Sequence, residues 1–220
     1  MNGLSKMNRS YSVYKKIRDS IIKNELQPGE RLIESELSRK FDMSRGPIRQ
    51  AFCYLEKDGY INVLPNKGAI VGKINSKDVR DYYALLSILE GKAVEWSFPN
   101  LNQDDIQKLV DINNSTRSLI EKNDKIDIMK WTKYNLIFHG VFWKKSGNEK
   151  LPLVITDIRK RLFRYRYWSI VVGSYEFYCK EHEEIIAHLK RCDVAGACKI
   201  MEEHVMTACQ NHLNMLDHVK

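Results

Sequence analysis

ESELSRKFDMSRGPIRQAFCYLEKDGY, residues 34–60, is the stretch that decides the fold of this 220-residue chain. Its pattern predicts two short helices joined by a tight turn. Ile33, Leu37 and Phe41 recur every four residues, which places them on one face of the first helix. The polar residues at 42–44 then break the pattern and mark the turn.

The second of these helices combines a buried face with exposed arginines. We expect it to begin at Ser44, whose hydroxyl can cap a free backbone N–H group, with Pro47 in its first turn. The apolar stripe of the helix is formed by Ile48, Phe52 and Leu55. Arg45 and Arg49 lie off this stripe near the N-terminal end, as in the recognition helix of a helix-turn-helix. The sequence therefore predicts a chain that binds DNA.

The flanking segments complete a winged helix-turn-helix. An amphipathic helix is expected over residues 11–25, before the two short helices. Residues 60–64 and 69–71 read as strands, and the turn between them, residues 65–68, would form the tip of a hairpin wing. We expect this DNA-binding domain to span residues 9–74.

The positive charge is concentrated in the same part of the chain. Residues 1–74 hold 14 lysines and arginines against 8 acidic residues, whereas the remainder holds 22 against 20. A basic domain attracts a polyanion, and phosphate contacts supply much of the affinity of a protein for DNA. A solvated surface would also be charged, so the charge supports DNA binding only together with the arginine-bearing helix.

Apolar runs and cysteine spacing indicate a cytoplasmic protein. No apolar run approaches the roughly 18 residues of a membrane span, and the first ten residues lack the apolar core of a signal peptide. The five cysteines form no C-x-x-C pair, which argues against a disulfide framework and a thiolate zinc site. We expect reduced thiols and no membrane partner.

The rest of the chain has a helical pattern, so the predicted fold class is mainly α. The expected all-α bundle spans residues 77–217 and would carry effector binding, metal binding and dimerisation. Its helical segments are expected at residues 77–97, 103–122, 126–145, 149–172, 175–191 and 194–217. Leu85, Leu89 and Trp96 suggest a partly or wholly buried first helix, and Leu136, Val141 and Trp143 suggest the same for the third.

Three histidines and one asparagine in this bundle have the spacing of a metal site. Asn135 and His139 are four residues apart and share a helix face. His182 and His204 each lie 11 residues from Asp193, so two antiparallel helices turning there would bring them to the same height. Three imidazoles and one oxygen suit zinc, nickel or a related divalent ion. His188, His212 and His218 are expected to be ordinary core or surface residues.

These features resemble the GntR family of bacterial transcriptional regulators, in its FadR branch, which joins a winged helix to an all-helical ligand-sensing domain of the FCD type. The first domain matches at residues 26–32, 34–37, 44–51 and 55–61. The second matches at residues 89–90, 138–139, 147–148, 181–185 and 201–204. Together these segments cover nearly the whole chain in order.

The resemblance implies roles for individual residues. It places Arg45 and Arg49 in the DNA major groove, and Gly68 at the wing tip near the minor groove. The full set expected at DNA is Arg31, Glu34, Ser44, Arg45, Arg49, Lys67 and Gly68. The expected metal ligands are Asn135, His139, His182 and His204, and the expected effector contacts are Ser87, Glu90 and Arg164.

Two positions depart from the family pattern. Asn135 stands where relatives often carry an aspartate, and an amide oxygen is a neutral and weaker ligand. Ser87 stands where related proteins often place an arginine that meets the carboxylate of an effector. Another cation could take that role, for example one of four arginines on a later helix, which could equally form a solvated face: Arg159, Arg161, Arg164 and Arg166.

We therefore expect a homodimeric repressor that binds an inverted-repeat operator and responds to a small molecule, such as an organic acid, near the metal. Two alternatives stay open at this point. A three-histidine site can hold an activated water, which would make the protein a metal-dependent enzyme. The metal ion could also itself be the signal.

Overall fold

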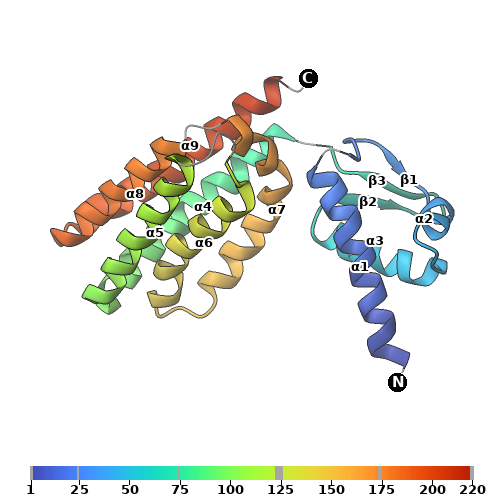
Figure 1. Cartoon of the computed structure of the whole chain (residues 1–220), viewed down its shortest axis with the longest axis horizontal. Helices are drawn as coiled ribbons and strands as arrows, with labels where there is room; N and C mark the ends of the chain where they lie inside the picture. Colours follow the sequence, from blue (N-terminus) through green and yellow to red (C-terminus); the bar gives the residue numbers. More distant parts are fainter. Residues whose placement is uncertain (1, 24, 74, 122–125, 173–174, 219–220) are drawn as a thin grey trace. The chain divides into compact units, whose positions relative to one another are not determined.

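The computed structural model describes residues 2–23, 25–73, 75–121, 126–172 and 175–218. Side chains are described for these residues except 2–8, 128, 163–172, 215, 217 and 218. The chain forms two compact units, one chiefly from residues 1–75 and the other chiefly from residues that follow Ser76 (Figure 1). None of the described helices is both long enough and apolar enough to cross a membrane.

The first unit is a winged helix-turn-helix. Its helices are α1 (Asn2–Ile22), α2 (Glu34–Lys40) and α3 (Arg45–Lys57). Its strands are β1 (Arg31–Leu32), β2 (Ile61–Leu64) and β3 (Gly68–Val71), in the antiparallel order β1-β3-β2 (Figure 1). The predicted stripe of Ile48, Phe52 and Leu55 is buried, and it packs with Val13 and Ile17 of α1.

Three details of this unit differ from expectation. Ser44 precedes α3 as expected, but its hydroxyl makes no capping hydrogen bond. Ile33 is the N-cap residue of α2 and is exposed, because the helix starts one residue after it. Strand β1 was not predicted, since two residues are too short to show a period.

Gly68 is required by the close packing of the wing. Its φ of +83° lies in the left-handed region, and Asn66 before it has a φ of +58°. A Cβ atom on Gly68 would lie 2.2 Å from the backbone oxygen of Leu32 in β1. The glycine therefore lets β1 approach the hairpin, which is a structural reason independent of DNA.

The second unit is all-helical, as predicted. Its helices are α4 (Ser76–Ser97), α5 (Gln103–Glu121), α6 (Ile128–Lys145), α7 (Leu151–Val172), α8 (Tyr175–Lys190) and α9 (Val194–His218), with a 3-10 turn at Phe98–Asn100. Every end lies within about two residues of the predicted one. Phe138, Phe142, Ile185 and Met201 are among the largest fully buried side chains.

Helices α4 and α6 are partly buried, as their apolar spacings suggested, although Leu85, Trp96 and Leu136 themselves are exposed. Leu85, Ile88 and Trp96 are 53%, 58% and 40% exposed, and they form an apolar stripe on one face of α4. The opposite face carries Tyr83 and other buried residues. A helix with apolar residues on both sides does not reveal from its sequence which side faces the core.

Candidate metal centre and nucleic-acid interface

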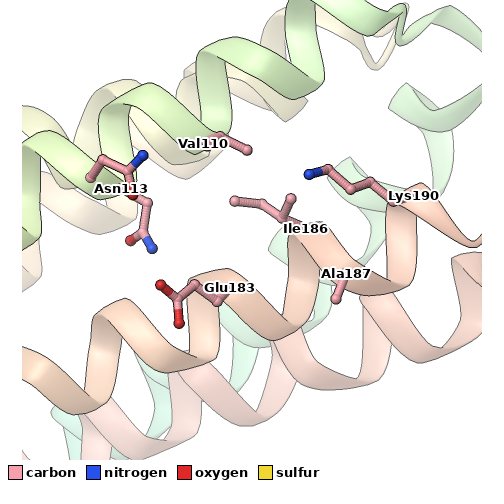
Figure 2. A pocket seen from close by; sticks show the side chains of 7 residues that line it. Val110, Asn113, Glu183, Ile186, Ala187 and Lys190 are labelled. Atoms are coloured by element: carbon pink, nitrogen blue, oxygen red, sulfur yellow. The ribbon is translucent and has the colours of Figure 1, made fainter.

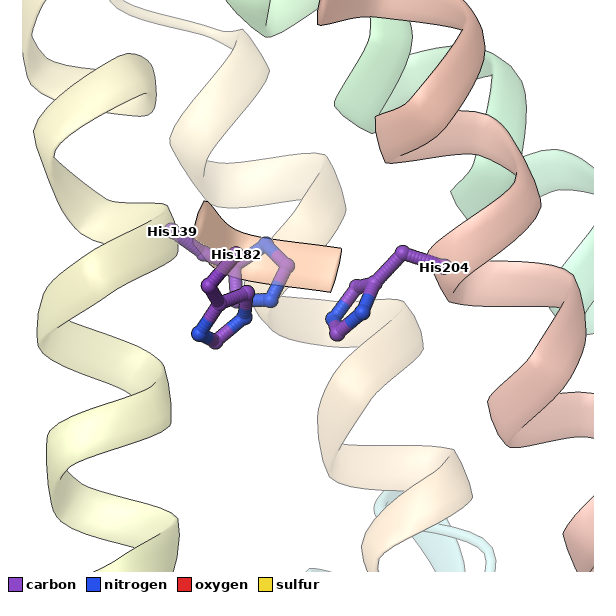
Figure 3. Close-up of side chains that lie close together, drawn as sticks. All are labelled: His139, His182 and His204. Carbon is purple, nitrogen blue, oxygen red and sulfur yellow. The ribbon is translucent and has the colours of Figure 1, made fainter. Parts of the chain in front are cut away.

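His139, His182 and His204 meet in the interior of the helical unit (Figure 3). They come from α6, α8 and α9, and all three are buried. One ligand nitrogen from each lies within 4.8 Å of the others. The ring centroids of His182 and His204 are 4.7 Å apart, so the two residues face each other across the α8–α9 hairpin as their spacing predicted.

The hairpin turn fixes the register of these two helices. Cys192 has a φ of +58°, and Asp193 directly precedes α9, which begins at Val194. The Asp193 carboxylate accepts the backbone N–H of Gly196 at 2.9 Å and contacts Nδ1 of His188 at 2.7 Å. His188, in the last turn of α8, thus contacts the residue that precedes α9.

Burial keeps the imidazoles of His139 and His182 neutral. Burial and the charge of Arg159 both lower the pKa of His139, and Glu90 acts in the opposite direction. The net result is a pKa of about 3. Burial and the two neighbouring histidines hold the pKa of His182 well below its ordinary value of 6.5. A neutral imidazole offers a lone pair at pH 7 without first losing a proton. The centre is therefore suited to bind a cation near neutral pH.

Two unpaired polar atoms also fit a metal ion. Among the described residues, Nε2 of His182 and Oδ1 of Asn135 are buried without a hydrogen-bond partner. Asn135 and His139 are four residues apart on α6 and so share one face of that helix. Since buried polar atoms normally have partners, these acceptors are consistent with a ligand set of three nitrogens and one oxygen.

Aromatic side chains hold the histidine rings. The ring of Phe138 stacks on His182 at a centroid distance of 3.8 Å and an interplanar angle of 10°. Tyr178 meets His204 edge-on at 5.6 Å, and Trp143 stacks near His139 at 6.3 Å. The rings are thereby oriented before any ion arrives, which lowers the entropic cost of binding.

Glu90 is the centre of a buried charged network beside His139. One of its carboxylate oxygens is paired with the Arg159 guanidinium. The other accepts the indole N–H of Trp143 at 2.7 Å and lies 3.3 Å from Nδ1 of His139. Burial alone raises the pKa of Glu90, but the charge of Arg159 and the bonds from His139 and Trp143 outweigh it and lower the pKa to about 2. Glu90 is therefore ionised.

The expected effector residues are only partly brought together. Glu90 lies beside the histidine cluster, but its carboxylate is already engaged by Arg159. The hydroxyl of Ser87 donates to the backbone oxygen of Glu202 on α9 at 3.2 Å. The side chain of Arg164 lies outside the described residues, as does that of Arg166. Arg159, one of the cations considered as a substitute, is paired with Glu90 and is not free to meet an effector.

A separate shallow groove lies between α5 and α8 (Figure 2). It has a volume of about 230 Å³. Its lining residues are Val110, Asn113, Asn114, Glu183, Ile186, Ala187 and Lys190. None of the histidines of the metal centre lines it, so it forms no part of that centre.

In the first unit, the predicted DNA-contacting residues lie on β1, α2, α3, the N-terminal flank of α3 and the wing. Arg45, Ser44 and Lys67 are exposed, and the side chain of Arg49 is 66% exposed. Nε of Arg49 lies 2.8 Å from the carboxylate of Glu34 on α2, which holds this arginine in one orientation.

Arg31 links the other end of this surface to the wing. Its guanidinium donates two hydrogen bonds, of 3.2 Å and 3.1 Å, to the backbone oxygen of Lys67. Arg31 therefore orients the wing tip, a role that the sequence pattern did not indicate. No acidic residue occupies the first turn of α3, and the carboxylate that pairs with Arg49 comes from Glu34 of α2.

Sequence reasoning missed Glu181 and Trp143 as parts of the metal centre. Glu181 contacts Nδ1 of His204 at 2.8 Å, although it precedes a different histidine in the sequence. The available signal was the carboxylate next to a candidate ligand, because metal-binding histidines commonly hydrogen-bond a carboxylate through their second nitrogen.

Comparisons with known proteins agree with this architecture. Residues 9–71 match the family described as "Bacterial regulatory proteins, gntR family", and residues 81–207 match the FCD domain. The chain is 24% identical over 209 residues to the "Uncharacterized HTH-type transcriptional regulator YdhC" of Bacillus subtilis, covering 94% of this chain and 90% of that protein. It is 24% identical over 194 residues to the repressor RspR of Escherichia coli, covering 88% and 84%. The structure of E. coli McbR/YncC has the same fold, with a TM-score of 0.69 and 21% identity over 96% of this chain and 99% of that one.

Proposed function

The chain belongs to the GntR family of bacterial regulatory proteins and carries an FCD domain, and we propose from this premise that it is a homodimeric repressor controlled at its three-histidine centre. It is a transcriptional regulator, because its families and relatives are regulators and not enzymes. The metal-dependent enzyme is therefore set aside. The cytoplasm is the proposed location, since the chromosome lies there.

The DNA interface is proposed on the N-terminal end of α3. Arg45 and Arg49 carry side chains long enough to reach base edges, and Arg can pair bidentately with guanine. The bond from Glu34 holds Nε of Arg49 and leaves its terminal nitrogens for DNA. Lys67 and Gly68 at the wing would approach the neighbouring groove, oriented by Arg31.

The dimer is proposed to form through the apolar stripe of α4. Leu85, Ile88 and Trp96 are exposed on one helix face, and a soluble monomer rarely leaves such a stripe uncovered. A second copy of the chain offers the same stripe, and a two-fold interface is self-complementary. Ile88→Glu should convert the dimer to a monomer in sedimentation analysis, whereas a dimer that persists would refute this surface.

The observation that supports control by a metal-centred site is the meeting of His139, His182 and His204 inside the FCD unit. Zinc or nickel is the proposed ion, because three imidazoles and an amide oxygen suit borderline divalent metals. When bound, the ion would supply a Lewis-acidic position at which a small-molecule effector, such as an organic acid, could be held. Glu90 lies beside that position, whereas Ser87 and Arg164 are retained only as proposed contacts.

Operator binding with and without metal tests this function. The full-length protein would first be used to select its preferred sequences from random duplex DNA, and affinity would then be measured by fluorescence anisotropy. We expect an inverted repeat to be selected. Failure to select any sequence would refute the proposal of a specific operator.

The same assay separates two forms of control. Metal-stripped and metal-loaded protein with different affinities for the selected DNA would identify the ion as the signal. The alternative result is that metal-stripped and metal-loaded protein bind the DNA equally well, and that an organic acid releases the DNA only from the metal-loaded protein. That result would identify the ion as the anchor of an effector. His139→Ala should abolish either response, because it removes one ligand.

A further inference from the structure

Glu181 joins the two helices of the α8–α9 hairpin at the level of the metal centre. It lies directly before His182 on α8, but its carboxylate points to α9. One carboxylate oxygen lies 2.8 Å from Nδ1 of His204, and the other accepts the hydroxyl of Thr207 at 3.1 Å. Since Glu181 is buried, both of its oxygens are satisfied by the neighbouring helix.

This contact selects one tautomer of His204. A carboxylate is only an acceptor, so Nδ1 of His204 must carry the proton and donate it to Glu181. The second nitrogen, Nε2, is then unprotonated and available to an ion. Because an imidazole that binds a metal commonly donates its other N–H to a carboxylate, the arrangement is that of a metal ligand held in place.

We propose that Glu181, anchored by Thr207, is the positioning residue that fixes His204 for metal binding. The inference rests on the proposed metal centre and adds the residue that sets its affinity. His204 and Thr207 are three residues apart on one face of α9, so the anchor and the ligand belong to the same surface. Thr207 keeps the carboxylate from rotating away from the imidazole.

Glu181 differs in this respect from Glu90, the other carboxylate that contacts a histidine of the centre. Glu90 is paired with Arg159, and it lies farther from Nδ1 of His139, at 3.3 Å. Among the described lysines and arginines, none forms an ion pair with Glu181. The carboxylate of Glu181 is therefore available to a bound cation through His204, whereas that of Glu90 is already paired with Arg159.

The test is the zinc affinity of the full chain, measured by competition with a chromophoric chelator. Glu181→Gln keeps an acceptor for His204 but removes the charge, and we expect affinity to fall about tenfold. Glu181→Leu removes both the acceptor and the charge and should lower the zinc affinity about a hundredfold, which lies within the range known for residues that hydrogen-bond a metal ligand. Thr207→Val should have a smaller effect in the same direction. Glu184→Gln, on the exposed side of the same helix, is the matched control and should leave the affinity unchanged.

Thermal melting of the metal-free proteins separates positioning from folding. We expect metal-free Glu181→Gln to melt with the wild type while its zinc affinity falls. Wild-type zinc affinity in the Glu181 variants would overturn the role of Glu181. A loss of zinc affinity that is matched by an equal loss of folded metal-free protein would overturn it as well. A wild-type protein that binds no zinc or nickel would instead overturn the proposed metal centre.

The absorption spectrum of the cobalt(II)-substituted protein gives a second readout. Release of His204 changes the coordination of the ion, so the visible bands of Glu181→Leu should differ from those of the wild type. The bands of Glu181→Gln should keep the wild-type pattern, because the hydrogen bond to His204 is retained. Identical bands in all three proteins would contradict the proposal.

Discussion

Replacing Arg159 by methionine tests how strongly the buried Glu90 depends on its partner. Methionine fills much of the volume of the arginine side chain but leaves the buried carboxylate of Glu90 without the guanidinium that pairs with it. Lowering the pKa of this group from 4.5 to about 2 corresponds to about 3 kcal/mol of stabilisation of the ionised form. Breaking a buried ion pair by removing one partner typically costs about 3–5 kcal/mol. The cost of breaking a buried ion pair therefore predicts a loss of about 3–5 kcal/mol in unfolding free energy, and the lowered pKa of Glu90 agrees in direction.

Tryptophan fluorescence is the appropriate assay for this variant. All four tryptophans of the chain follow residue 75, so their emission reports unfolding of the helical unit and not of the winged helix. Urea titration of wild type, Arg159→Met and the double variant Glu90→Gln/Arg159→Met gives the comparison. We expect the double variant to be more stable than Arg159→Met, because no buried charge is left unpaired.

The pH dependence adds a second criterion. Without Arg159 the pKa of Glu90 should rise, because burial then acts with less opposition, and the group can take up a proton in mildly acidic solution. The difference in unfolding free energy between wild type and Arg159→Met should therefore become smaller as the pH is lowered from 7 to 5. A deficit below about 1 kcal/mol at pH 7, comparable to an exposed ion pair, would refute the reasoning.

Three further predictions concern DNA, metal and acid. Arg49→Ala should lose about 1–3 kcal/mol of specific operator binding in anisotropy titrations, and an unchanged affinity would show that Arg49 reads no base. Asn135→Asp should bind zinc more tightly than wild type but melt at a lower temperature when metal-free, because a buried carboxylate needs the ion to balance it; equal zinc affinity would remove Asn135 from the ligand set. The metal-free helical unit should lose stability as pH falls below 6.5 towards 3, since His139 takes up a proton in this range only when the protein is unfolded. Glu90, whose pKa in the folded protein is lowered to about 2, should reduce the stability further below pH 4.5. Urea midpoints that do not change between pH 7 and 5 would contradict the neutral, buried state of the histidines.

Local patterns were sufficient to predict most helices of this chain. Turn residues such as those at Gly147-Asn148 interrupt the apolar period, and the helices of the structure end close to them. The facing of His182 and His204 was also predictable, because equal distances from one turn determine equal heights on two antiparallel helices. Such features depend only on residues near one another in sequence.

The remaining features depend on distant residues. Glu90 and Arg159 are 69 positions apart, and neither residue indicates the other by its local pattern. Leu85 and Trp96 belong to the spacing that suggested a partly or wholly buried helix but are exposed, since a helix that is apolar on two faces has no unique inner side. The contact of Glu181 with His204 depends on how two packed helices are rotated, which spacing alone does not specify.

The metal content of the purified protein tests the central claim most directly. Elemental analysis of wild type should find one zinc, nickel or related divalent ion per chain, and His182→Ala should lose it while retaining its helical circular dichroism. Full occupancy in His182→Ala, or a wild-type protein that holds no such ion even after dialysis against zinc and nickel, would contradict the account.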